Sequence, residues 1–254
     1  MANLTILNSD LHKSIRINPD RDLAFAAERH LLPLNISEVS RAIIDFPVLI
    51  TRVQGSGNYA LSALTSFIPR QNAFFAEGQW GAGFQPAEMQ TYPFALVPGN
   101  DETPGPQLAF DEAAPVFTET DGEPLFDESG QPALWVTQLK NQLLANAENM
   151  VITRQFLERI SSLGLISEIV IGVQRTEDHV DRIGGLSTIN EDRLKSLANE
   201  ELGALRDAGF LGPIYAILFS MFQLNTLIRI HNARYADAPI QRINLEIARD
   251  KHQN

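Results

Sequence analysis

The segment from Gly212 to Asn232, GPIYAILFSMFQLNTLIRIHN, constrains the fold more than any other because it is apolar over an unusual length. The 16 residues from Pro213 to Ile228 include no charge, and they are fewer than the roughly 20 apolar residues that span a bilayer. A helix that is apolar on nearly every face is typical of the centre of a soluble protein. We therefore expect a buried helix over residues 213–231, no transmembrane segment, and the other elements packed around this helix.

The size and composition of the chain are those of an ordinary globular protein. Its 254 residues could form one large domain or two small ones, and either arrangement could bury a substantial core. Hydrophobic residues make up 44 % of the chain and charged residues 20 %, which argues against global disorder. We expect a single compact domain over residues 1–254.

The net charge of −11 comes mainly from one segment. Residues 101–131 hold nine of the 31 acidic residues and no Lys or Arg, and the rest of the chain is nearly neutral. Because nucleic-acid binding depends on Lys and Arg that neutralise phosphates, the charge argues against a nucleic-acid partner. A calcium loop is also disfavoured, since the acidic residues lack the ligand spacing of an EF-hand.

The absence of cysteine excludes disulfides, thiolate zinc sites and a cysteine nucleophile. The first 20 residues, MANLTILNSDLHKSIRINPD, show no basic region followed by an apolar core and a small-residue cleavage site. We therefore expect a cytoplasmic protein.

Two pairs of β-branched runs predict hairpins. Residues 47–54 and 58–67 flank a Gly-Ser-Gly turn, and residues 165–174 and 180–189 flank a short polar loop. The Gly-Ser-Gly sequence lacks the Lys-Ser/Thr pair of a nucleotide-binding loop and no helix follows it, so turn chemistry explains it better than phosphate binding.

Helical patterns concentrate later in the chain. Residues 133–163 show a near-helical apolar spacing that ends at Gly164. A helix capped by Asn190 is expected over residues 191–197, and another over 200–208. In the tail, Ile240, Ile243 and Ile247 could form the stripe of a last helix, although fraying is an alternative. The sequence thus predicts an α+β fold. Its N-terminal half is mostly antiparallel β hairpins (β-rich 1–132), and its C-terminal half is mostly helical (helix-rich 133–254).

An aromatic and glycine-rich segment over residues 72–98 is the first candidate for binding. Trp80, Phe84 and Tyr92 could form a shallow recognition surface, since rigid rings supply contact area at little entropic cost. The alternative is that these rings seal a sheet.

Motifs that carry catalysis are absent from the sequence. There is no GxSxG and no GxGxxG, and the five histidines show no metal-ligand spacing. Asp111 and Glu112 are adjacent, so on a strand they point to opposite faces and cannot easily act as one acid/base pair. These observations argue against an enzyme, and no metal or cofactor is predicted.

Several segments, in order along most of the chain, resemble the bacterial SapC family. The resemblance lies in LNSDLHKSIRINPD, FAAERHLLPL, DFPVLITR, GFQPAEMQTYPFAL, FDEAAPVF, GEPLFDESGQP and NEDRLKSLANEELGALRDAGFLGPIYAILFSMFQLNTLI. The resemblance implies a link to surface-layer systems, and to genomic neighbourhoods with outer-membrane receptors and flavin halogenase-like enzymes. It supplies no catalytic residue that could be transferred to this chain.

Three functional hypotheses follow. The leading one is a non-enzymatic accessory protein that binds a peptide or protein client, linked to cell-envelope or surface-layer biogenesis. It would use Trp80, Phe84 and Tyr92 for contact, and Asp111 and Glu112 for charge. The first alternative is an enzyme whose site is assembled from dispersed residues (Arg29, His30, Tyr92 and Asp111). The second alternative is a self-assembling structural protein, and the sequence leaves the oligomeric state open.

Overall fold

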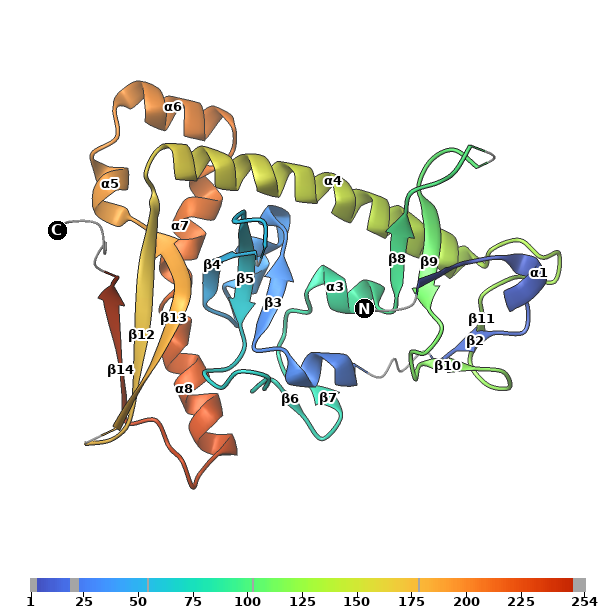
Figure 1. The fold of residues 1–254 in the computed structure, drawn as a ribbon, viewed down its shortest axis with the longest axis horizontal. Helices are drawn as coiled ribbons and strands as arrows, with labels where there is room; N and C mark the ends of the chain where they lie inside the picture. Colours follow the sequence, from blue (N-terminus) through green and yellow to red (C-terminus); the bar gives the residue numbers. More distant parts are fainter. Residues whose placement is uncertain (1–3, 19–22, 54, 102, 178, 249–254) are drawn as a thin grey trace. The chain divides into compact units, whose positions relative to one another are not determined.

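The computed structural model describes residues 4–18, 23–53, 55–101, 103–177 and 179–248 (Figure 1). The chain divides into two compact units, of which the first is residues 1–25 and 87–148 and the second is residues 26–86 and 149–254. The sequence predicted one domain that is rich in strands up to residue 132 and rich in helices after it. The contacts between residues divide the chain inside a long helix, α4 (Leu134–Ser162). A short 3₁₀ helix, η1 (Ala24–Glu28), crosses the boundary between residues 25 and 26, and the third boundary lies between residues 86 and 87.

The first unit contains two small antiparallel sheets. Their strand orders are β1–β9–β8 and β10–β2–β11. The strands are β1 (Leu4–Ile6), β2 (Arg16–Ile17), β8 (Phe94–Val97), β9 (Gln107–Asp111), β10 (Phe117–Thr118) and β11 (Glu123–Pro124). The helices of this unit are α1 (Ser9–His12), α3 (Ala87–Thr91) and the first part of α4.

An aromatic cluster forms the core of the first unit. The ring of Phe110 is fully buried and meets the ring of Phe117 edge-on, with a centroid separation of 5.0 Å. Phe94 packs edge-on against Phe117 at 5.9 Å and against Trp135 of α4, also at 5.9 Å. Edge-to-face pairs of this kind add to the stabilisation that burial provides.

The second unit is built on a six-stranded antiparallel sheet with the order β14–β12–β13–β4–β5–β3. Figure 1 shows these strands in this order from left to right. They are β3 (Leu31–Leu34), β4 (Val48–Arg52), β5 (Tyr59–Leu64), β12 (Ile166–Thr176), β13 (His179–Ile189) and β14 (Arg242–Ile247). A separate two-stranded ribbon pairs β6 (Phe75–Ala76) with β7 (Gln79–Trp80).

Both predicted hairpins are confirmed. Strands β4 and β5 pair antiparallel from Val48↔Ala63 to Arg52↔Tyr59, and β12 pairs with β13 in the same manner. The turn between β4 and β5 places Gly55 and Gly57 at φ values of 84° and 69°, a region that favours glycine. The α+β class is therefore confirmed, with two of the longest strands in the second half of the chain.

Helices of the second unit follow local sequence signals. They are η2 (Ile36–Glu38), α2 (Val39–Ala42), α5 (Glu191–Lys195), α6 (Asn199–Asp207), α7 (Leu211–Ser220) and α8 (Gln223–Arg234), with the second part of α4. The side chain of Asn190 accepts a hydrogen bond from the Arg193 amide and caps α5 as predicted. Helix α4 ends before Gly164, whose φ is 67°.

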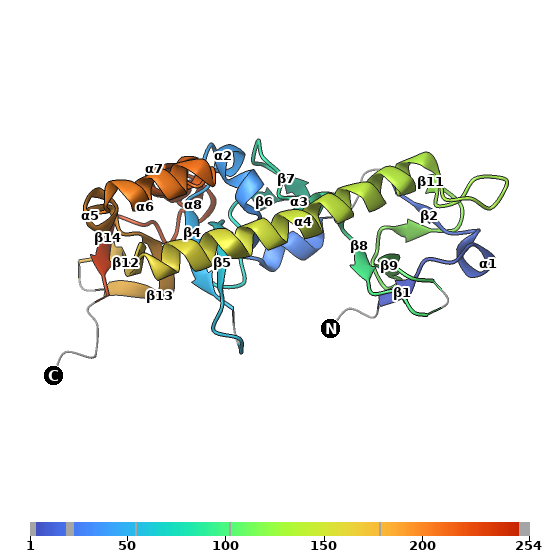
Figure 2. The same ribbon diagram turned by 90° about the horizontal axis from the view of Figure 1, so that it is seen from above.

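The expected buried helix over residues 213–231 is two helices with only one buried face. Ile214, Ile217 and Leu224 are buried, whereas Phe219 and Phe222 are 60 % and 73 % exposed. Helix α7 packs on β4 and β13 and against α2, and α2 and α7 lie side by side in Figure 2. The prediction of a helix buried on nearly every face was wrong, because an absence of charge does not require that every face be covered.

Ser220 lies at the break between α7 and α8. Its hydroxyl accepts a hydrogen bond from the amide of Val48 (2.9 Å) and donates one to the carbonyl of Ile217 (2.7 Å). The amides of Met221 and Phe222 then bond to residues three positions earlier, which tightens the helix locally. The side-chain amide of Gln223 donates to the carbonyls of Ile43 (3.1 Å) and Ile44 (2.9 Å). Polar side chains therefore anchor the break to β4 and to the end of α2.

The tail forms a strand and not the last helix that the isoleucine stripe suggested. Strand β14 pairs antiparallel with β12, from Ile169↔Ile247 to Gln174↔Arg242. The helical interpretation used Ile240, Ile243 and Ile247, whereas the strand alternates Ile243, Leu245 and Ile247 on one face. Pairing with β12, which is distant in the sequence, favours the two-residue repeat of a strand over the repeat of a helix.

Candidate functional site

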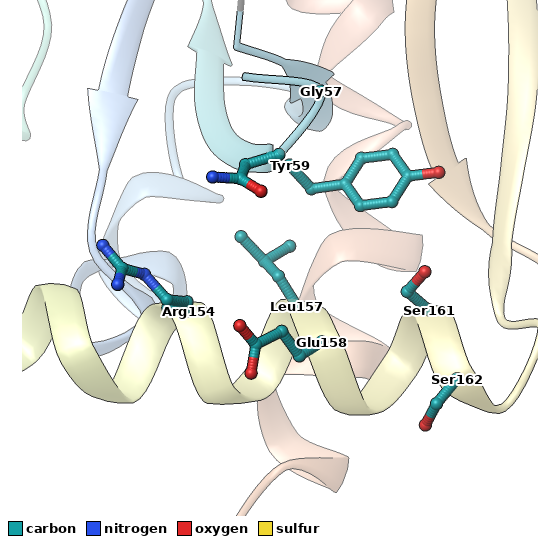
Figure 3. A pocket seen from close by; sticks show the side chains of 8 residues that line it. Gly57, Tyr59, Arg154, Leu157, Glu158, Ser161 and Ser162 are labelled. Atoms are coloured by element: carbon teal, nitrogen blue, oxygen red, sulfur yellow. The ribbon is translucent and has the colours of Figure 1, made fainter.

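A groove in the second unit lies between the β4–β5 hairpin and α4, with a cavity volume of about 360 Å³. Its lining residues are Gly57, Asn58, Tyr59, Arg154, Leu157, Glu158, Ser161 and Ser162. Figure 3 shows Tyr59 opposite Leu157 and Ser161, while Ser162 points away from Tyr59. Arg154, Leu157 and Ser161 share one face of α4 because they recur at intervals of three and four positions.

Most residues that line the groove are polar, and they carry both signs of charge. Arg52 donates a hydrogen bond to the Tyr59 hydroxyl (2.9 Å), lies over the ring at 4.6 Å from its centroid, and approaches Glu168 at 3.5 Å. Arg154 and Glu158 add one charge of each sign from α4. The lining includes no histidine that could activate a serine hydroxyl. Such a groove can hold a short polar group.

A second surface of this unit is apolar and exposed. Tyr215, Phe219 and Phe222, here called the aromatic ridge, are 44 %, 60 % and 73 % exposed. The rings of Tyr215 and Phe219 stack with centroids 6.3 Å apart. Ile44 is 69 % exposed, and its carbonyl accepts the bond from Gln223, next to Phe222. Exposed aromatic groups that gather in this way mark interaction surfaces more often than single exposed residues do.

Trp80 and Phe84 are brought together in the second unit as packing groups. The Trp80 indole N–H donates to the Phe84 carbonyl at 3.1 Å, and the Trp80 ring lies 5.9 Å from the ring of Phe46. Phe84 is buried, with Arg41 over its ring at 5.2 Å, and the Phe84 amide donates to Asp45 at 2.7 Å. These contacts match the alternative in which the rings seal the fold.

Tyr92, Asp111 and Glu112 belong to the first unit. The Tyr92 ring stacks on Phe25 at 4.1 Å. The Asp111 carboxylate accepts a bond from the nearby Ala113 amide at 3.2 Å, while Glu112 lies 3.3 Å from the buried His12. Asp111 and Glu112 thus have different neighbours, as expected for adjacent residues.

Arg29 and His30 belong to the second unit, so the four residues of the enzyme hypothesis are divided between the two units. The carbonyl of Arg29 accepts a bond from the Thr65 hydroxyl at 2.6 Å. Nδ1 of His30 accepts a longer bond from the Arg70 amide at 3.4 Å. Burial lowers the pKa of His30 below its usual value.

Neither the groove nor the aromatic ridge was predicted from the sequence. The ridge had a readable signal, since Tyr215, Phe219 and Phe222 recur at helical spacing and Ser220 does not share their face. The groove had no comparable signal, because β5 and α4 are far apart in the chain. Within the residues that the structure describes, no group of three or more His, Asp or Glu side chains could hold a metal ion.

The segment Leu211–Arg234 is long and apolar enough to cross a membrane by length and composition. The core helix of a soluble protein passes the same test, so the expected absence of a transmembrane segment stays a prediction.

These features define an α+β protein with an exposed aromatic surface. A family model described as SapC matches residues 7–227, and the chain therefore belongs to the SapC family. No curated protein and no solved structure matches the chain.

Proposed function

We propose that this protein is a non-enzymatic accessory protein that binds a peptide or protein client in the cytoplasm. The observation that carries this proposal is the aromatic ridge, because three large apolar side chains are 44–73 % exposed on one helical surface. Aromatic side chains provide much of the binding energy in protein interfaces. The link to cell-envelope or surface-layer biogenesis rests on the family resemblance.

The chemistry of the ridge favours an apolar protein surface over a lipid surface. Membrane-surface helices carry Lys and Arg beside their apolar face, and residues 211–228 have no charge. The acidic segment of the first unit would favour a client that carries a basic stretch.

Site-specific photocrosslinking in the producing cell tests this proposal. A photoreactive phenylalanine analogue replaces Phe219 or Phe222, and the control position is Val180, which is 47 % exposed on β13. We expect a discrete adduct with a separate polypeptide from the ridge positions and none from Val180. In the Phe222 probe protein, the added substitutions Tyr215→Ala and Phe219→Ala should lower the adduct yield.

Three outcomes would contradict the proposal. The first is equal crosslinking from Val180 and from the ridge. The second is an adduct with the mass of two copies of this chain, which would make the ridge a self-interface. The third is binding to anionic lipid vesicles that Phe219→Ala abolishes, which would make the ridge a lipid-binding surface.

A further inference from the structure

Strand β14 forms an edge of the six-stranded sheet. The amide of Ala248 donates to the carbonyl of Glu168 at 2.9 Å, and this bond fixes which backbone groups of β14 face β12. Because an antiparallel strand alternates these groups, Arg242, Asn244 and Glu246 face β12. The N–H and C=O groups of Ile243, Leu245 and Ile247 therefore face away from β12, at the open edge of the sheet.

The two edges of this sheet differ in how they are protected. Proteins blunt exposed edges with proline, charged side chains, bulges or a covering segment. The opposite edge, β3, carries Pro33, whereas β14 contains no proline, and its two charges, Arg242 and Glu246, have opposite signs. Leu245 is 48 % exposed and Ile247 is 73 % exposed. An edge with open backbone groups and exposed apolar side chains can accept another strand.

We propose that β14 pairs antiparallel with β14 of a second copy of this chain, which joins two six-stranded sheets across a two-fold axis at Asn244. In this register, Arg242 of each copy lies opposite Glu246 of the other, and Ile243 lies opposite Leu245. The outward backbone groups of Ile243 and Leu245 meet the corresponding groups of the second copy, as ladder hydrogen bonds require. The strand is thus self-complementary in charge and in apolar contacts.

Charge also selects the direction of pairing. A parallel arrangement in register would place Arg242 opposite Arg242 and Glu246 opposite Glu246, and like charges directly opposite are destabilising. Within one copy, Glu246 already pairs with Arg182 at 2.7 Å, and both side chains remain about half exposed. Arg242 of the second copy would therefore extend an existing row of alternating charges. A two-fold contact of this kind is self-limiting, so it gives a dimer and not a filament.

The proposed contact is independent of the client-binding proposal, because it uses a different element of the second unit. Strand β14 also lies beyond residues 7–227, the part of the chain that the family model matches. Six residues per copy make a small interface, so we expect association that depends on concentration.

Sedimentation velocity of the full chain over about two orders of magnitude in concentration tests the dimer. Leu245→Pro removes an outward N–H and leaves the bonds to β12 intact, so it should give a folded monomer throughout the range. Leu245→Ala is the matched variant that keeps the N–H, and it should weaken the dimer less. Near-ultraviolet circular dichroism confirms that each variant is folded.

Charge reversal tests the register. Arg242→Glu and Glu246→Arg each place like charges opposite one another, and each should raise the dimer dissociation constant by about tenfold. The double variant, and an equimolar mixture of the two single variants, should restore association. A wild-type monomer at every concentration would overturn the proposal. So would a dimer that is unaffected by Leu245→Pro, or a double variant that fails to restore association.

Discussion

The two faces of α7 and α8 are both apolar, yet the protein covers only one of them. On one face Ile214 and Ile217 are fully buried, and on the other Phe219 and Phe222 are mostly exposed. The faces differ in their polar residues, because Ser220 lies on the buried side and bonds to β4. Hydrophobicity alone therefore does not show which face of a helix is buried. A small polar side chain that can bond to a buried backbone group, as Ser220 does, helps to identify that face.

Truncation on the buried face should have the largest effect. Ile217 is fully buried, so Ile217→Ala should lower the free energy of unfolding by about 2–5 kcal/mol through lost contacts and a cavity. Urea denaturation followed by circular dichroism measures this loss. A loss no larger than that of Phe219→Ala would mean that the two faces contribute equally to stability.

The hydroxyl of Ser220 should have the next largest effect. Ser220→Ala leaves the buried amide of Val48 without its acceptor, which should cost about 1–3 kcal/mol in the free energy of unfolding. The matched control is Ser162→Ala, since Ser162 makes a similar local bond to a carbonyl three residues earlier but is exposed. The control should change stability by less than about 0.5 kcal/mol. Equal effects of the two substitutions would contradict the anchoring role of Ser220.

Lowering the pH should reduce the free energy of unfolding through His231, which is fully buried on α8. Burial, with a smaller contribution from Arg175, lowers the pKa of His231 below its usual 6.5. The unfolded chain therefore takes up the proton first, and the stability present above pH 6.5 is lost as the pH falls through the lower pKa of the folded protein.

Urea midpoints at pH values above and below 6.5 measure this dependence. His231→Gln should reduce the slope of stability against pH, and the remaining slope should include His30, whose pKa burial also lowers. An unchanged slope in His231→Gln would show that His231 does not couple protonation to folding.

The exposed face should respond least in stability. Phe219→Ala and Phe222→Ala should each change the free energy of unfolding by about 0.5 kcal/mol or less, because these rings are mostly in solvent. Thermal unfolding of each variant alongside the wild type measures the difference. A large loss from either substitution would indicate that the ring is covered in solution and would remove the basis for the proposed client surface.

Local patterns in the sequence were sufficient for several elements of the fold. These elements depend on residues that are close together in the sequence. They are the hairpin of β12 and β13, helix α4 up to Gly164, and the Asn190 cap. Propensity, capping and turn chemistry act over such distances. These predictions were confirmed because local preference and tertiary packing agree at these positions.

Features that depend on distant partners could not be predicted. The tail forms strand β14, and not a helix, because it pairs with β12. The division of the chain within α4 depends on which residues the two parts of this helix contact. The candidate residues Trp80 and Phe84 formed a recognisable aromatic group, but the sequence could not show that their bonds to each other and to Asp45 turn them inward. The exposure of Phe219 likewise depends on what the other elements leave uncovered.

The order of the six-stranded sheet has a consequence for synthesis on the ribosome. Its two central neighbours, β4 and β13, pair through Ile50↔Ser187, which joins the first quarter of the chain to its last third. Between them the ribosome must translate all of residues 87–148, which belong to the other unit. The hairpin of β4 and β5 therefore emerges early with an unpaired, apolar edge, and nascent chains with such an edge are prone to aggregate. Slowed translation before β13 should prolong this exposure, whereas the same pause after β14 should have no such effect.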